Sequence, residues 1–285
     1  MANIKLTYPS QDYGGKGDSL HFLHANGYPP GCYQPLLDHL TAHFHVFGMV
    51  MRPLRDGYEP DRLQSWQLLS DDLNDFLEKY NDGSVVAFGH SLGAVVSLRA
   101  AIQNPKKYRA LILIDPVIFP PVVIHGWKLI KRLGLGYKLH PLIPTAKNRR
   151  ARFENLETIF RAYRQKKIFR YINDDNLKFM ITGMVKPAAT TGFELSYSPA
   201  WEVQIYYTGV APDMDLWDAF PKIRLPLLII RGAETNTFLP VTASRIRTVR
   251  PETTIETLQK ATHLVPLEKP REVSDVMISF LEKVP

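Results

Sequence analysis

The stretch from Ser84 to Leu98 reads SVVAFGHSLGAVVSL and decides the fold. It predicts an apolar strand up to Phe88, a tight turn over Gly89–Gly93, and a helix that follows at once. The two glycines are expected because side chains at positions 89 and 93 would collide with the neighbouring strand and helix. A G-x-S-x-G turn in this context holds a serine hydroxyl at the end of a strand. The pattern makes Ser91 a candidate nucleophile, and the backbone N–H of Leu92 a candidate donor to a developing oxyanion.

Similar apolar runs recur along the chain, and none of them shows a clean alternation of apolar and polar residues. They are Leu20–Leu23, Val46–Val50, Val85–Phe88, Leu111–Ile114 and Leu227–Ile230. Runs of this kind, separated by helix-like stretches, are typical of parallel strands that are covered on both faces. The expected class is α/β, with a mostly parallel central sheet and helices on both faces.

More than a hundred residues separate the fourth of these runs from the fifth, far more than an ordinary crossover needs. From Lys128 to Lys178 this segment has fourteen Lys/Arg and four Asp/Glu, and apolar residues recur within it at helical spacing. The spacing predicts an inserted, mostly helical cap. Its basic run is either a solvated helix face or an attractor for anionic substrates or surfaces. We expect no nucleic-acid partner, because no reading motif accompanies the charge.

The composition of the 285 residues is that of a globular protein, with 45% hydrophobic and 22% charged residues and a net charge of +7. Cys32 is the single cysteine, so no internal disulfide or thiolate metal site is expected. The N-terminal residues lack the order of a secretory signal. The longest apolar stretch, Leu111–Ile124, is interrupted by Asp115 and three prolines and is too short to span a bilayer. We expect a cytoplasmic protein without a transmembrane segment.

Two further stretches, taken with the GHSLG turn, give the chain a resemblance to the α/β-hydrolase superfamily over almost its whole length. Residues 22–29, FLHANGYP, stand where such enzymes carry an oxyanion loop, and residues 261–270, ATHLVPLEKP, look like the family's histidine loop. The resemblance implies that His263 is the general base and that the backbone N–H of Tyr28 is the second oxyanion donor. It also implies a hydrolase core over residues 1–118 and 212–285, a cap over 119–211, and no cofactor or metal.

The acidic member of the expected triad is the difficult assignment. Residues 231–240, RGAETNTFLP, resemble the pattern in which many hydrolases place the acid, but Asn236 occupies the position of the aspartate. An amide cannot stabilise an imidazolium by charge. Asp115, which closes the run Leu111–Ile114, is the leading substitute, because some hydrolases place their acid after this strand. Asn236 as an amide occupant and Glu234 as the acid stay open.

We therefore expect a serine hydrolase that acts on an ester or related acyl substrate through Ser91, His263 and Asp115. A small apolar or amphipathic substrate is expected, and homo-oligomer formation is left open. Aromatic residues that could line its pocket are Tyr28, Trp127, Phe193, Trp201, Tyr206, Tyr207 and Trp217. The alternatives are a catalytically weakened binding protein, suggested by Asn236, and a C–C bond hydrolase, perhydrolase or acyltransferase on the same fold.

Overall fold

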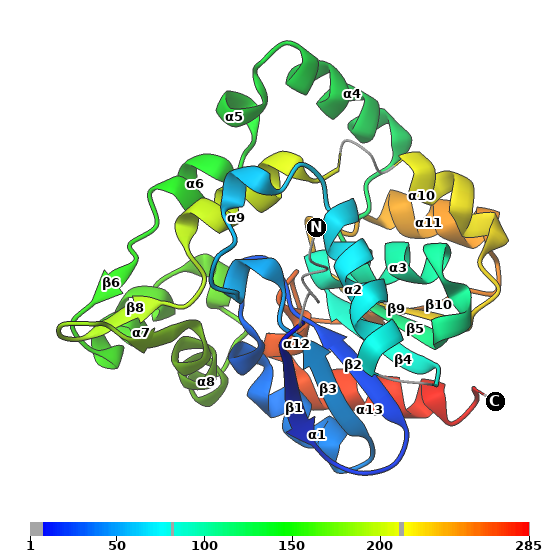
Figure 1. The fold of residues 1–285 in the computed structure, drawn as a ribbon, viewed down its shortest axis with the longest axis horizontal. Coiled ribbons are helices and arrows are strands. Elements are labelled where there is room, and N and C mark those ends of the chain that lie inside the picture. Colours follow the sequence, from blue (N-terminus) through cyan, green and yellow to red (C-terminus); the bar gives the residue numbers. More distant parts are fainter. Residues whose placement is uncertain (1–7, 81–82, 211–213, 285) are drawn as a thin grey trace, which may run out of the picture.

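The computed structural model describes residues 8–80, 83–210 and 214–284. Its centre is a seven-stranded sheet with the strand order β1-β3-β2-β4-β5-β9-β10, in which β1 pairs antiparallel with β3 and every other pairing is parallel (Figure 1). The strands are β1 (Ser10–Gly14), β2 (Ser19–Leu23), β3 (His45–Met49), β4 (Val85–His90), β5 (Tyr108–Ile114), β9 (Leu227–Gly232) and β10 (Thr254–Leu258). The five predicted apolar runs all lie in this sheet, so the predicted α/β class is confirmed.

Helices cover both faces of the sheet and divide the core into two hydrophobic clusters. Along β5 the side chains alternate between them, with Leu111 and Leu113 in one cluster and Ile112 and Ile114 in the other. Because both faces of the sheet are buried, the residues that point to either face are apolar. This explains why the runs are continuous and show no alternation of apolar and polar residues. The first cluster contains side chains of α2 (Gln67–Tyr80), α3 (Leu92–Gln103), α10 (Met214–Ala219) and α11 (Pro240–Val249). The second contains side chains of α1 (Gln34–Thr41), α12 (Val265–Glu268) and α13 (Pro270–Leu281).

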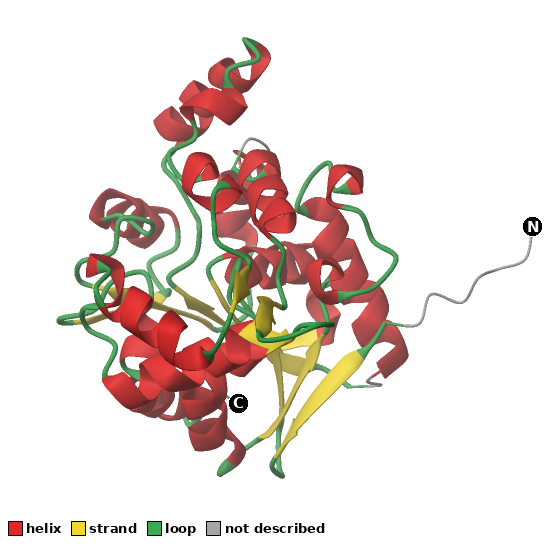
Figure 2. Cartoon of the chain, turned by 90° about the vertical axis from the view of Figure 1, so that its left-hand side faces the viewer, coloured by secondary structure: helices red, strands yellow, loops and turns green. Residues whose placement is uncertain are grey.

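The segment between β5 and β9 contains both helices and a small sheet. Its helices before α10 are α4 (Pro121–Arg132), α5 (Gly136–Leu139), α6 (Ile143–Lys147), α7 (Leu156–Arg164), α8 (Asp174–Met184) and α9 (Pro199–Thr208). Three short antiparallel strands lie among them, and we had not predicted these: β6 (Arg152–Phe153), β7 (Val185–Pro187) and β8 (Phe193–Leu195). Figure 2 shows helices that project from the body of the molecule at the top, where Figure 1 labels α4 and α5.

The α8 part of the insert is joined closely to the helices that cover the central sheet. Its buried side chains share a hydrophobic cluster with α1, α12 and α13. Its Gly183 also faces Gly31, which lies in a short 3-10 turn after β2, and a Cβ atom on Gly183 would lie 2.1 Å from the carbonyl carbon of Gly31. Two backbones therefore touch at this point, which only glycine permits.

Among the residues that the structure describes, no helix is long and apolar enough to cross a membrane.

Candidate active site

Ser91 lies in the sharp turn between β4 and α3, and its backbone has φ 56° and ψ −112°. This left-handed φ is uncommon for a residue with a side chain. A Cβ on Gly89 would lie 2.4 Å from the carbonyl carbon of Gly93, and one on Gly93 would lie 2.2 Å from the carbonyl oxygen of Leu23. The two glycines thus allow α3 to approach both its own strand and the end of β2, as expected from the sequence. The turn is held by the Ser91 N–H, which donates to the Ile114 carbonyl at 2.9 Å.

Three side chains from distant parts of the sequence meet at this turn. The distance from Ser91 Oγ to His263 Nε2 is 2.9 Å, and the distance from His263 Nδ1 to Asp115 Oδ1 is also 2.9 Å. The serine follows β4, the aspartate follows β5 and the histidine follows β10, so all three lie at the carboxyl edge of the sheet. With an imidazole that carries its proton on Nδ1, the aspartate accepts from the histidine and Nε2 accepts from the serine hydroxyl.

Asp115 is fully buried and has partners for both of its carboxylate oxygens. Besides His263, Oδ1 accepts from the hydroxyl of Thr235 at 2.6 Å, and Oδ2 accepts from the backbone N–H of Gly232 at 3.0 Å. Its own φ is 41°, so the chain turns sharply here at the end of β5. Three donors thus converge on the carboxylate and fix its position beside His263.

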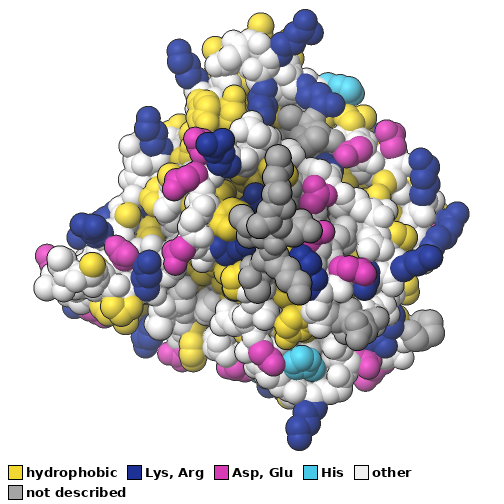
Figure 3. Space-filling view, viewed as in Figure 1, with side chains coloured by type: hydrophobic (Ala, Val, Ile, Leu, Met, Phe, Trp, Pro, Cys, Tyr) yellow, Lys and Arg dark blue, Asp and Glu magenta, His cyan; other side chains and the backbone are white. Residues whose placement is uncertain are grey.

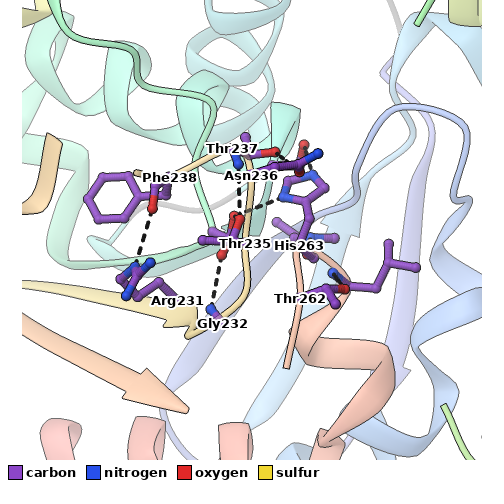
Figure 4. Close-up of polar contacts among 12 residues, drawn as sticks. Arg231, Gly232, Thr235, Asn236, Thr237, Phe238, Thr262 and His263 are labelled. Carbon is purple, nitrogen blue, oxygen red and sulfur yellow. Dashed lines mark hydrogen bonds and ion pairs between the residues drawn. The ribbon is translucent and has the colours of Figure 1, made fainter. Parts of the chain in front are cut away.

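The loop after β9 contains the two other candidates for the third member of the triad, Asn236 and Glu234, and Figure 4 shows its residues Thr235, Asn236 and Thr237 near His263. Asn236 is exposed, and its side-chain oxygen accepts from the Thr237 hydroxyl at 3.4 Å. Glu234 is also exposed, and its carboxylate binds Arg170 at 2.7 Å and Tyr171 at 2.6 Å. Neither side chain hydrogen-bonds to His263 within the described part of the chain.

The histidine loop is shaped by a buried carboxylate. Glu268 accepts from both the backbone N–H and the hydroxyl of Thr262, each at 2.7 Å. Burial raises the pKa of Glu268, and these two hydrogen bonds oppose that shift. The Thr262 hydroxyl in turn accepts from the Leu264 N–H at 3.2 Å. These contacts fix the backbone on both sides of His263.

His90, next to the serine, links this loop to the loop after β2. Burial, reinforced by the nearby His263, holds the pKa of His90 well below 6.5, so its ring is neutral. Its Nε2 lies 2.7 Å from the His263 carbonyl and must donate to it, so Nδ1 accepts from the Tyr33 hydroxyl at 2.8 Å. The Tyr33 oxygen accepts from the Ala25 N–H at 3.1 Å. The sequence could not reveal this chain of contacts, because its members are distant along the chain and match no motif.

Residues 24–28, the loop after β2, form a turn beside the start of α3. Tyr28 donates its backbone N–H to the Ala25 carbonyl at 3.3 Å, and Gly27 supplies the positive φ of 74°. The Tyr28 N–H that the sequence suggested as an oxyanion donor is therefore engaged in this turn. The Asn26 N–H, by contrast, has no hydrogen-bond acceptor among the described residues.

An ion pair from the insert lies against the same turn. Arg149 Nη1 is 2.6 Å from a carboxylate oxygen of Glu202, and the two side chains are 17% and 12% exposed. A Cβ on Gly27 would lie 3.1 Å from both side chains, and the Asn26 side-chain amide donates to the Glu202 carbonyl at 3.1 Å. Within the basic run, Arg149 is thus a partnered, largely buried group and not an exposed one.

The aromatic residues suggested as a pocket lining do not lie in one place. Trp217 packs on Phe220 and donates to the Phe119 carbonyl, in the core. Tyr207 stacks on Tyr137 with ring centroids 3.9 Å apart. Tyr206 interacts electrostatically with Tyr28, beside the ion pair. Trp201 belongs to the hydrophobic cluster that contains Leu92, whereas Trp127 stacks edge-on to His140, and Phe193 pairs with Phe153 in the small sheet.

Across residues 8–80, 83–210 and 214–284 no group of three or more His, Cys, Asp or Glu side chains is arranged to hold a metal ion.

Comparison with known proteins agrees with this architecture. The model of the alpha/beta hydrolase family matches residues 22–276. The chain belongs to this family. A curated relative, the sn-1-specific diacylglycerol lipase ABHD11 of Mus musculus, is 23% identical over 231 residues, which cover 79% of this chain and 67% of the lipase.

Two solved structures of hydrolytic enzymes superpose on the chain over nearly its full length. E-2-(acetamidomethylene)succinate hydrolase does so with a TM-score of 0.76 and 19% identity, covering 96% of this chain and 94% of that one. A thermophilic esterase from Thermogutta terrifontis gives a TM-score of 0.65 and 20% identity, covering 97% and 93%. At these identities the similarity establishes the shared fold, and the chain is a hydrolase of the alpha/beta family.

Proposed function

We propose that this alpha/beta hydrolase cleaves an ester or related acyl substrate, with Ser91 as nucleophile, His263 as general base and Asp115 as the acid that orients and stabilises it. The observation that carries the proposal is the unbroken row from Ser91 Oγ through His263 to Asp115, with 2.9 Å at each link. A serine hydroxyl is almost fully protonated at neutral pH and needs a base within this reach. The buried carboxylate supplies the negative charge that an imidazolium requires.

In the first half of the reaction, Ser91 Oγ attacks the substrate carbonyl carbon while its proton moves to His263 Nε2. Asp115 balances the resulting imidazolium and does not itself take up the proton. The tetrahedral intermediate collapses when His263 returns that proton to the departing alcohol, which leaves an acyl group on the serine. A water molecule then gives a proton to His263 and attacks the acyl carbon, and the acid is released as the serine recovers its proton.

The oxyanion of this intermediate needs two N–H donors. We assign the first to Leu92, because it begins α3 directly after the serine. We assign the second to the loop of residues 24–28. Within that loop the Tyr28 N–H already donates to the Ala25 carbonyl, whereas the Asn26 N–H has no acceptor among the described residues. We therefore favour Asn26 over Tyr28 as the second donor.

The names of two similar proteins support an ester as substrate, since one is a diacylglycerol lipase and the other an esterase. We further propose that residues 119–211 act as a cap, which places α4–α9 over the carboxyl edge where ligands of open α/β sheets bind. The weakened-enzyme alternative rested on Asn236 as the third member. It loses its support, because a buried carboxylate faces His263 instead.

The direct test is labelling with a fluorophosphonate, followed by intact-mass measurement. We expect one adduct in the native protein and none in Ser91→Ala. Ser97→Ala is the matched control, because Ser97 is also buried in this region but makes no hydrogen bond to His263. An adduct that persists in Ser91→Ala, or a native protein that is not labelled, would contradict the proposal. Rates on p-nitrophenyl esters of increasing chain length would then separate ester hydrolysis from the other reactions of the fold.

A further inference from the structure

Residues 121–142 form a helical arm that comprises α4, α5 and the loop up to Leu142. In Figure 1 the arm lies at the top of the molecule, and Figure 2, turned by 90°, also shows helices projecting at the top. Twelve large hydrophobic side chains are exposed in the described part of the chain, and eight of them lie in this arm. They are Val122, Val123, Leu129, Leu133, Leu135, Tyr137, Leu139 and Leu142. Such a concentration of exposed apolar surface marks an interaction site.

On α4 this exposed surface forms a stripe. Val122, Leu129 and Leu133 are seven and four residues apart, which places them on one side of the helix. Their exposures are 75%, 58% and 62%. Ile124, on the opposite side of the helix, is fully buried in the core. The helix therefore has one apolar side that packs on the protein and a second that packs on nothing within the described chain.

The charged residues of the arm itself and of its flanks in the sequence are all of one sign. Residues 116–153 contain eight Lys/Arg and no Asp or Glu. Lys128, Arg132 and Lys138 are exposed, and helical spacing places Lys128 and Arg132 to one side of the apolar stripe. In Figure 3 dark blue Lys and Arg side chains lie beside yellow hydrophobic ones at the top of the molecule.

The arm is held in a fixed position by its inner side. Lys131 donates to the Tyr207 carbonyl at 2.9 Å, and Tyr137 stacks on the Tyr207 ring. His140 stacks on Tyr206 with ring centroids 5.3 Å apart. Because α9 anchors the arm in this way, its outer side is presented as a preformed surface.

From these observations we propose that the arm docks this hydrolase onto an anionic lipid surface. The apolar stripe would enter the boundary between headgroups and acyl chains, while Lys128, Arg132 and Lys138 would contact the negatively charged headgroups. A helix with leucines on its exposed side and basic residues beside them is the pattern of an interfacial helix. Long Lys and Arg side chains can also keep their charges in water while their stems lie on the lipid.

A second copy of the chain is a poorer occupant of this surface. Two arms facing each other would bring four Lys/Arg against four, with no carboxylate from residues 121–142 to neutralise them. A lipid surface supplies both an apolar phase and the opposite charge.

The test measures binding to vesicles, using Ser91→Ala protein so that lipid hydrolysis plays no part and the result does not depend on the proposed activity. We expect sedimentation with vesicles of phosphatidylcholine and phosphatidylglycerol, and much weaker sedimentation with phosphatidylcholine alone. Leu129→Ser/Leu133→Ser should weaken binding on the order of a hundredfold, since two leucines lose their burial in lipid. Lys128→Gln/Arg132→Gln/Lys138→Gln should weaken binding to the anionic vesicles about tenfold or more, and higher salt should have the same effect.

Matched controls carry the same chemical changes elsewhere on the surface. Val241→Ser removes an exposed hydrophobic side chain from α11, and Lys16→Gln/Lys106→Gln/Lys222→Gln removes three exposed charges away from the arm. Both should bind as the parent does, and all variants should keep the parent's urea midpoint. The proposal is overturned if neither vesicle binds, if both bind equally, or if the controls weaken binding as much as the arm variants do. A dimer in sedimentation velocity that Leu129→Ser/Leu133→Ser dissociates, with no vesicle binding, would make a second copy the occupant.

Discussion

Two loops at the carboxyl edge of the sheet each contain a candidate partner for His263, Asp115 in one and Asn236 in the other. The surroundings of these two side chains differ sharply. After β5, Asp115 is fully buried and accepts hydrogen bonds from Thr235, Gly232 and His263. After β9, Asn236 is exposed, and its side-chain oxygen accepts a hydrogen bond from its neighbour Thr237 and none from His263. A carboxylate is useful to an imidazolium where it is desolvated and held by several donors, and only the first loop provides this environment.

The second loop nevertheless contributes to the site. Two of the donors to Asp115, the Thr235 hydroxyl and the Gly232 N–H, come from β9 and the loop after it. In the triad that we propose, the position after β9 therefore supports the acid instead of supplying it. This explains how an asparagine can stand at position 236 in an active hydrolase.

The largest effect is expected from Asp115→Asn. The amide keeps the shape but loses the charge, and with its oxygen facing His263 and Thr235 its NH2 group faces the Gly232 N–H, which loses its acceptor. We expect kcat to fall about 10³–10⁴-fold, by analogy with the same change in a protease triad. Steady-state kinetics on a p-nitrophenyl ester measures this. Urea unfolding must accompany it, and a folded Asp115→Asn protein with native kcat would refute the role of Asp115.

A smaller effect is expected from Thr235→Val, which keeps the side-chain shape but removes the 2.6 Å hydrogen bond to Asp115 and the 3.1 Å one that the Thr235 hydroxyl accepts from the Thr237 N–H. A hydrogen bond to a charged group contributes about 1.5–3 kcal/mol. We expect the free energy of unfolding to fall by about this amount and kcat to fall about tenfold, because Gly232 and His263 still hold the carboxylate. Thr237→Val is the matched control and should leave both quantities unchanged. Equal effects of the two variants would mean that the second loop does not support the acid.

Asn236→Asp should change kcat by less than about threefold, because the imidazolium already has a buried partner and an exposed carboxylate is screened by solvent. The comparison becomes sharper in the double variant Asp115→Asn/Asn236→Asp, in which we expect no recovery of the lost rate. A large gain in the single variant, or recovery in the double one, would show that position 236 is a vacated acid site.

The smallest effect is expected from Glu234→Gln, and only on stability. The hydrogen bond from Tyr171 and the Arg170 guanidinium hold the pKa of Glu234 below 4.5 in the folded protein. A carboxyl with a depressed folded-state pKa stabilises the protein above its unfolded pKa, and this contribution is lost as the pH falls through the folded value. The urea midpoint of Glu234→Gln should thus lie slightly below that of the native protein at pH 7, and the difference should shrink as the pH falls below 4.5. Loss of ester hydrolysis in this variant would instead implicate Glu234 in the site.

The sequence predicted the centre of the fold better than its edges. Runs such as Val85–Phe88 are apolar because both faces of a central strand are buried, so pattern alone reveals them. The edge strand β1 reads SQDYG and is largely exposed, so its pairing with β3 depends on backbone contacts that composition does not encode. The short strands of the insert, two or three residues long, carry no periodic signal at all.

In the candidate site, the sequence predicts residues that stand in local motifs better than it predicts contacts between residues that are far apart along the chain. Ser91 and His263 stand in recognisable local motifs, and the structure brings their side chains together. The choice between Asp115 and Asn236 depends on which side chain the fold buries, which no local pattern states. The contacts of His90 with Tyr33, and of Arg149 with Glu202, join residues 57 and 53 positions apart. Only the folded chain makes such pairs visible.

The contact between Gly31 and Gly183 restricts how the α8 part of the insert can move. Where two backbones touch, α8 cannot slide or tilt away from the core without opening a void that no side chain is present to fill. That half of the insert is therefore held closely against the core by its backbone, whereas the arm is held to α9 through side-chain contacts such as the stacking of Tyr137 on Tyr207. Even the smallest side chain at position 183 would push the Gly31 backbone aside, so we expect Gly183→Ala to lower the free energy of unfolding.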